Sequence, residues 1–246
     1  MTVKRFYTLF CILLIQVLCV YGQTMHSDVY EFSIKPETEE WWQFETIGKR
    51  IVALQMPDEV LLSISTEGLL ETCLNFPYLL DILFANNYQQ GFESLVNKFN
   101  GFGELLRRSD LADVALEKYS RFSTDVLNIH SKSNIERGML SFRRFVLEFI
   151  LVQDVVLQNL TEEQEKQLFL LSFEHKQIKQ NFLDIFGNLH DVPANLLYAK
   201  KVMNDSEFKF ESDELKQSLT CFIQAPVTIN QKRMKYIEDY IIAKYK

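Results

Sequence analysis

The residues best suited to metal or hydrolytic chemistry are histidines that stand close to acidic side chains. His190 and Asp191 are adjacent in the chain, and His175 follows Glu174 at the end of a helical pattern. Imidazole and carboxylate groups are common ligands of catalytic metal ions. The alternative is that His190 lies in a loop and Asp191 caps a helix that begins at Pro193. A metal-dependent hydrolase that uses His175, His190 and Asp191 is therefore one of two hypotheses for function.

Two cysteines, Cys73 and Cys221, lie on segments with helical apolar spacing. A disulfide between them is allowed in an oxidising compartment. The other prediction is two buried free thiols, because cysteines on separate helices need Cα atoms within about 7 Å to form a bridge. No histidine shares a motif with either thiol, so neither is expected to be a nucleophile. The sequence therefore predicts no catalytic residue outside the histidine group.

Adjacent tryptophans, Trp41 and Trp42, are the candidate binding residues. Neighbouring side chains on a helix point about 100° apart, so one tryptophan is expected in the core and the other at the surface. Trp41 continues an apolar stripe through Ile47 and Ile51, and Trp42 lies off that stripe. Because aromatic side chains dominate the energy of many interfaces, Trp42 and then Trp41 are the predicted contacts.

The first 22 residues have the pattern of a secretory signal peptide. Lys4 and Arg5 precede an apolar run over residues 6–20, and cleavage is predicted after Gly22. The run is shorter than the roughly 20 apolar residues that a spanning helix needs. Export to the periplasm or the medium is therefore expected, with no transmembrane span after the leader. Removing the two basic residues from a chain of 26 basic and 33 acidic side chains leaves a net charge of −9, which argues against nucleic acid as a partner.

The remaining chain has the composition of an all-α protein. Gly and Pro number only 8 and 5, and apolar residues recur at steps of three and four. Residues 23–35 are predicted to be a loose leading segment and residues 36–246 a single helical domain. No fixed-period repeat is present, so we predict an irregular α-solenoid or an orthogonal multi-helical array of short helical hairpins. The predicted boundaries between the first short helices are Pro57, Ser65, Pro77, Gly91 and Gly101.

Three segments carry stronger helical signals. Residues 142–157 are apolar on nearly every side, which predicts a central core helix, and their charged residues argue against a membrane span. Thr161 and Gln164 form a capping box that predicts a helix start. Near the C-terminus, Met234 and Ile237 begin an apolar stripe that predicts a last amphipathic helix.

The stretch from Met56 to Tyr119 resembles a segment of uncharacterised secreted proteins of Bacteroidetes. The resemblance rests on the runs STEGLLETCLNFP, QQGF and FNGFGELLRRSD, and it extends more loosely to Leu168. It implies an exported, all-helical protein of a bacterial envelope. It implies no activity, cofactor or catalytic residue, because none is assigned to that family.

The first hypothesis for function is a non-catalytic, extracytoplasmic helical scaffold that binds a protein or peptide partner in a groove. It rests on the predicted fold, the leader and the lack of a recognisable catalytic constellation. No cofactor is predicted, and the oligomeric state is left open. The metal-dependent hydrolase is the alternative.

Overall fold

The computed structural model describes residues 28–187, 191–227 and 229–245. The predicted signal peptide and His190 lie outside the described residues. Helices make up 71% of the structure, and the described ranges contain no strand, so the predicted all-α multi-helical array is confirmed. In chain order the elements are α2 (Glu39–Gln43), α3 (Ile47–Ala53), α4 (Asp58–Ser63), α5 (Thr66–Leu74), the 3-10 helix η1 (Leu79–Phe84), α6 (Tyr88–Lys98), α7 (Asn100–Leu105), α8 (Leu111–Ser120), α9 (Phe122–Asp125), the 3-10 helix η2 (Ile129–Ser131), α10 (Asn134–Leu151), α11 (Asp154–Leu157), α12 (Glu162–Gln180), α13 (Leu183–Phe186), α14 (Val192–Met203), α15 (Asp213–Gln224) and α16 (Gln231–Tyr245).

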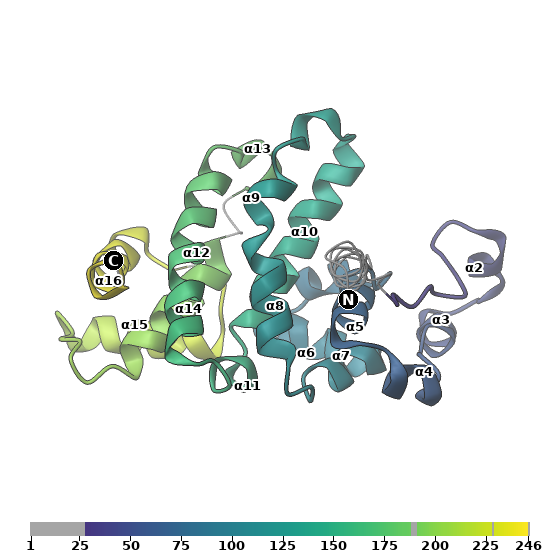
Figure 1. Ribbon diagram of the computed structural model, residues 1–246, viewed down its shortest axis with the longest axis horizontal. Coiled ribbons are helices and arrows are strands. Elements are labelled where there is room, and N and C mark those ends of the chain that lie inside the picture. Colours follow the sequence, from purple (N-terminus) through teal and green to yellow (C-terminus); the bar gives the residue numbers. More distant parts are fainter. Residues whose placement is uncertain (1–27, 188–190, 228, 246) are drawn as a thin grey trace, which may run out of the picture.

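Helix α10 occupies the middle of the molecule, as Figure 1 shows, and packs against α5, α8, α13 and α14. Helices α2, α3 and α4 form one end of the elongated molecule, and α15 and α16 form the other. Every residue from Phe145 to Leu151 is buried, because this half of α10 has neighbours on all sides. The prediction of a central core helix is therefore confirmed.

The bounds of that helix differ from the prediction. A capping box between Ser133 and Glu136 starts α10 eight residues earlier than the apolar run begins. The extended backbone of Gln153, with ψ of 141°, ends the helical path and makes α11 a separate turn. Apolar composition predicted what is buried, whereas the caps decided where the helix begins and ends.

The other two strong signals are confirmed. The Gln164 backbone N donates to Thr161 Oγ1 at 3.2 Å, and the Thr161 backbone N donates to Gln164 Oε1 at 2.9 Å. These two bonds satisfy donors at the start of α12 that have no partner within the helix. In α16 the predicted stripe is the buried face, with Met234 and Ile237 in the core.

The predicted single stripe from Trp41 to Ile51 is wrong as a continuous helix. The chain leaves the helical path after α2, and Thr46 caps a new helix, with the Lys49 backbone N donating to its Oγ1 at 3.3 Å. Ile47 is consequently exposed, although its spacing from Trp41 suits a common face. A threonine that bonds backbone donors begins a helix more readily than it continues one.

Gly91 and Gly101 lie inside α6 and α7, so they are not the boundaries that the sequence predicts. Gly91 is needed where α6 crosses η1. A Cβ atom at that position would lie 2.1 Å from the Ile82 carbonyl oxygen, which no real side chain tolerates. The glycine therefore serves close packing of two helices.

The leading segment is not loose where it is described. The Asp28 carboxylate accepts a hydrogen bond from the Ser65 backbone N at 2.6 Å, and the Tyr30 backbone N donates to Thr72 Oγ1 at 2.9 Å. Phe32 then enters the core. Side-chain burial and hydrogen bonds to α5 hold this part of the chain without helical structure.

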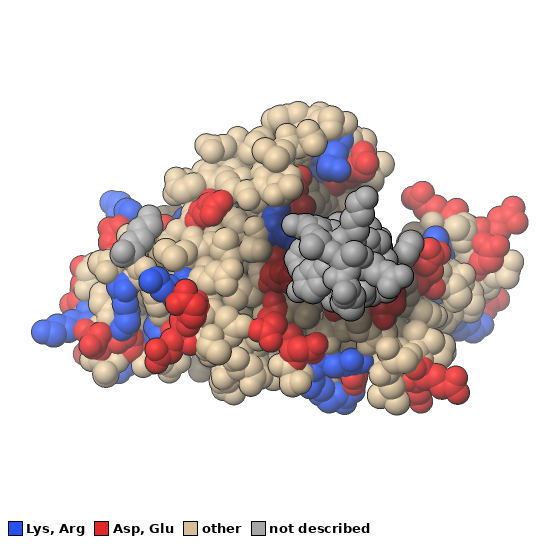
Figure 2. All heavy atoms as spheres, viewed as in Figure 1, with Lys and Arg blue, Asp and Glu red and all other residues tan. Residues whose placement is uncertain are grey.

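Two apolar cores are present within the described residues. The large core runs through most helices, and a small one of Phe122, Val126, Ile129 and Phe186 joins α9, η2 and α13. In Figure 2 the end of the molecule formed by α9, α13 and the start of α10 shows few charged side chains on the visible face. Across the described ranges, we find no helix with the length and apolar character needed to traverse a membrane.

Candidate functional site

A layer of buried charges, which we call the charged layer, lies beside the small core. Glu148 of α10 is its central carboxylate, and it binds two cations. Arg144 Nε donates to Glu148 Oε1 at 3.3 Å, and Lys179 Nζ of α12 donates to Glu148 Oε2 at 2.5 Å. All three side chains are buried. Burial lowers the pKa of both Arg144 and Lys179, and the carboxylate of Glu148 opposes that effect.

Aromatic rings enclose the Arg144 guanidinium. Its Cζ lies 3.9 Å from the ring centre of Tyr119 and 4.1 Å from that of Phe122, within the range of cation–π attraction. Nη1 donates to the Tyr119 carbonyl oxygen at 3.2 Å. The side chain therefore joins α8 and α9 to α10 without contact with bulk water.

His175 of α12 completes the charged layer. Arg144 Nη2 donates to His175 Nδ1, and a guanidinium has no acceptor to offer. Nδ1 is therefore the acceptor and the proton of the neutral ring is on Nε2, which is buried with no hydrogen-bond partner among the described residues. Burial first, and then the charges of Arg144 and Lys179, lower the pKa of His175 to about 2. The imidazole stays neutral under ordinary conditions.

A second pair of opposite charges extends the layer towards the C-terminus. Lys176 Nζ of α12 donates to Glu238 Oε2 of α16 at 2.8 Å, with both side chains mostly buried. Asp191, directly before α14, belongs to the same neighbourhood. Burial raises its pKa, against the opposing effect of Lys176 and Lys179.

This arrangement does not favour the predicted metal site. His175 and Asp191 both lie near the charged layer, but cations surround them, and a guanidinium occupies Nδ1 of His175. Among the residues that the structure describes, no three His, Cys, Asp or Glu side chains are grouped so that they could hold a metal ion. Asp191 precedes α14 at the predicted capping position, without a capping hydrogen bond from its side chain.

In the His175→Gln variant, the free energy of unfolding is expected to fall less than in the wild type as the pH is lowered. The unfolded chain binds a proton at the ordinary histidine pKa of 6.5, whereas the folded protein does so only near 2. Stability is therefore complete above pH 6.5 and falls as the pH drops, by about 2 kcal/mol at pH 5. Glutamine keeps an acceptor for Arg144 but does not titrate. Urea unfolding of both proteins at pH 7, 6 and 5 measures the difference.

The matched control is His130→Gln, because His130 is exposed. This variant should keep the acid sensitivity of the wild type. The raised pKa of Asp191 contributes a slope of the opposite sign, so the comparison of variant with wild type isolates His175. Equal slopes for wild type and His175→Gln would show that folding does not lower the pKa of His175.

The two cysteines are free thiols in different surroundings. Cys73 of α5 is buried, and burial raises the pKa of its thiol, whereas Cys221 of α15 is exposed. The prediction that both thiols are buried is therefore wrong for Cys221, whose side chain lies outside the buried face of its amphipathic helix. The alternative prediction, a disulfide between Cys73 and Cys221, is wrong, because both cysteines are free in the structure.

The tryptophan pair has the predicted division. Trp41 is buried beside Tyr78, with ring centres 5.5 Å apart, and Trp42 is 64% exposed. The Arg50 guanidinium lies over both rings, at 5.1 and 5.4 Å from their centres. Trp42 is therefore available for contact, on α2 at the end of the molecule remote from α15 and α16 (Figure 1).

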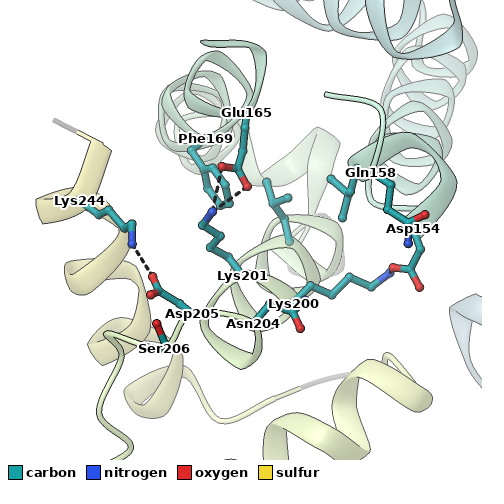
Figure 3. Close-up of a pocket in the computed structure, with 12 residues that line it drawn as sticks. Asp154, Gln158, Glu165, Phe169, Lys200, Lys201, Asn204, Asp205, Ser206 and Lys244 are labelled. Atoms are coloured by element: carbon teal, nitrogen blue, oxygen red, sulfur yellow. Dashed lines mark hydrogen bonds and ion pairs between the residues drawn. The ribbon is translucent and has the colours of Figure 1, made fainter. Parts of the chain in front are cut away.

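Two cavities lie along α14, and we call them together the α14 groove. Its first cavity has a volume of 440 Å³ and lies between α11, α12, α14 and α16 (Figure 3). Three lysines cross it, each bound to a carboxylate. Lys200 Nζ donates to Asp154 at 2.6 Å, Lys201 Nζ to Glu165 at 2.8 Å, and Lys244 Nζ to Asp205 at 2.7 Å.

The second cavity adjoins the first, since the ion pair between Lys200 and Asp154 lines both. It has a volume of 590 Å³, and both cavities share Asn204 as well as that pair. Gln89 of α6 and Gln224 of α15 supply amide groups at its far side. The two adjoining cavities of the α14 groove therefore offer both charged and amide groups.

Sequence reasoning missed the α14 groove. The only local signal is the pair of lysines in the last turn of α14, and that is typical of ordinary helix-dipole stabilisation. Lys200 and its partner Asp154 are 46 residues apart, and no short-range pattern indicates that they meet.

Comparisons with family models, curated proteins and solved structures found nothing that matches this chain. The resemblance of Met56 to Tyr119 to secreted proteins of Bacteroidetes therefore stays a prediction. What the protein binds or converts has to be inferred from the chemistry of its own surfaces.

Proposed function

We propose that this protein is a non-catalytic helical scaffold that binds an extended, basic segment of a protein partner in the α14 groove. The observation that carries the proposal is the pair of adjoining cavities, of 440 and 590 Å³, that share Asp154, Lys200 and Asn204. Each volume falls within the roughly 300–1,000 Å³ of typical ligand sites. Together they offer room for several consecutive residues of a peptide.

The exposed charges of the groove favour a basic segment. Asp154 is 73% exposed and its partner Lys200 only 15%. Glu165 is 34% exposed and its partner Lys201 22%, whereas in the third pair Lys244 is 31% exposed and Asp205 only 6%. The more exposed member is thus a carboxylate in two of the three groove pairs, and the formal net charge of the whole chain is −7. Complementary charge speeds association and selects the partner.

The proposal places this binding outside the cytoplasm. That location rests on the signal-peptide pattern of residues 1–22, which lie outside the described residues. Trp42 is not part of the α14 groove, since it lies on α2 at the other end of the molecule. It is a separate candidate contact for the same kind of partner.

Asn204→Trp is expected to block the groove. Asn204 is exposed and lines both cavities, so an indole there fills the space that the peptide needs. Peptides can be selected from a displayed random library with the wild-type protein, and their Kd measured by fluorescence anisotropy. We expect Lys- and Arg-rich peptides whose affinity falls at least about tenfold in the variant, which corresponds to about 1.4 kcal/mol.

Asn128→Trp is the matched control, because Asn128 is also exposed but lies outside the groove. It should bind the selected peptides as the wild type does. Binding should weaken as the salt concentration rises about tenfold, from roughly 50 to 500 mM, because salt screens the attraction between exposed charges. Equal affinity in Asn204→Trp, or selection of acidic peptides, would contradict the proposal.

A further inference from the structure

A separate, smaller cavity lies between α5, α8, α9 and α10, and we call it the Arg143 pocket. Its volume is 200 Å³. It shares no lining residue with the α14 groove, so its chemistry is independent of the function proposed above. Three cations, Lys118, Arg143 and Arg144, line it together with Phe122 and three leucines.

Two of the three cations in this pocket are already neutralised. Lys118 Nζ donates to the Glu71 carboxylate. The guanidinium of Arg144 faces Glu148 and is enclosed by aromatic rings in the charged layer. Lys118 and Arg144 therefore each already have a carboxylate partner.

Arg143 is different. Among the described residues no carboxylate forms an ion pair with it, and its Nε is buried without a hydrogen-bond acceptor. A buried donor without an acceptor costs free energy. A ligand carboxylate on the guanidinium would recover that cost if the side chain shifts to bring Nε into the pocket. Guanidinium groups bind carboxylates in a two-point geometry that also orients the ligand.

The rest of the pocket limits what that ligand is. Leu74, Leu140 and Leu147 line it together with the Phe122 ring, which suits an apolar body. The carboxylates of Glu71 and Asp125 in the same lining oppose a doubly charged anion such as a phosphate monoester. The volume of 200 Å³ is below that of sites for drug-sized molecules.

We propose that the Arg143 pocket binds a small monocarboxylate with an apolar body, with its carboxylate on the Arg143 guanidinium and its hydrocarbon part against the leucines. A short-chain fatty acid has this chemistry, and so does the C-terminal residue of a peptide. Both ligands carry a single negative charge attached to an apolar group about the size of one side chain.

Hexanoate is the probe for this site, with the full exported chain as the protein. Calorimetric titration should give a Kd of about 1 mM or tighter, a value within the usual efficiency of ligands of this size. Hexan-1-ol, which lacks the charge, and hexyl phosphate, which carries about two charges, should each bind at least about tenfold more weakly. Acetyl-Gly-Leu, which has a free C-terminal carboxylate, distinguishes a peptide end from a free acid: tighter binding than hexanoate assigns the pocket to peptide ends, and weaker binding assigns it to free acids.

Arg143→Gln should lower the hexanoate affinity at least tenfold, because the amide keeps the polarity of the side chain but loses its charge. Arg107→Gln is the matched control, since Arg107 is exposed, pairs with Glu104 and is not part of the lining. Leu140→Trp, which fills the pocket, should also abolish binding. Circular dichroism establishes that each variant is folded.

A readout on the wild-type protein needs no variant. The side-chain Nε–H signal of Arg143 in a ¹⁵N-correlated NMR spectrum should shift as hexanoate is added, while that of Arg107 should not. The proposal is overturned if hexan-1-ol or hexyl phosphate binds as tightly as hexanoate, or if Arg143→Gln keeps full affinity. Absence of binding and of any Arg143 shift at about 10 mM hexanoate, a concentration tenfold above the expected Kd, overturns it as well.

Discussion

Phe149→Asp is expected to abolish the folded state. Phe149 is fully buried in α10, with ring centres 6.0 Å from Phe92 and 5.8 Å from Phe145. Loss of a buried phenyl ring costs about 3–5 kcal/mol, and an unpaired buried carboxylate adds several more. The total stability of a domain is typically about 5–15 kcal/mol, so little or none remains. Circular dichroism and thermal unfolding measure the outcome.

Phe84→Asp is the control for this substitution, because Phe84 is among the most exposed apolar side chains and lies at the end of η1. It should unfold within a few degrees of the wild type, as surface changes usually shift stability by less than about 0.5 kcal/mol. A folded, monomeric Phe149→Asp protein with a wild-type melting temperature would mean that this face of α10 meets solvent.

The second large effect is expected for Glu148→Gln. This carboxylate is the shared partner of Arg144 and Lys179, and all three groups are buried. Removing its charge takes away the carboxylate that both buried cations share, which costs about 3–5 kcal/mol. The glutamine side chain is nearly the same size, so the loss reports charge rather than packing. Urea unfolding at pH 7 gives the difference in unfolding free energy.

A matched pair on α8 separates burial from charge. Arg121 and Glu117 are four residues apart, as Arg144 and Glu148 are, but both are largely exposed. Glu117→Gln should therefore change stability by no more than about 0.5 kcal/mol, the usual contribution of an exposed pair on a helix. Similar costs for Glu117→Gln and Glu148→Gln would show that water reaches the charged layer.

The all-α class and several helix starts could be predicted because their causes are local. The capping box of Thr161 and Gln164 needs only the bonds between residues three apart. The buried stripe of α16 follows from helical spacing alone. The burial of Phe149 also follows from the sequence, because a helix that is apolar on all sides is stable only where other elements cover it.

Predictions failed where a local signal had two physical meanings. A glycine can end a helix or permit close approach, and only the crossing of η1 over α6 decides that Gly91 does the second. Thr46 can continue an apolar helix or cap a new one, and in the structure it caps α3. In neither instance does the spacing of apolar residues distinguish the two meanings.

A helical chain, the cap of α12 and the central apolar segment follow from the sequence alone, because hydrogen bonds and side-chain spacing within one helix set those features. The candidate sites, in contrast, arise from contacts between helices that are distant in the chain. Lys179 meets Glu148 across 31 residues, and Lys200 meets Asp154 across 46. The Arg143 pocket likewise exists only because four helices converge on it. Such sites depend on the directions in which separate helices pack. Residue spacing along the chain does not reveal those directions.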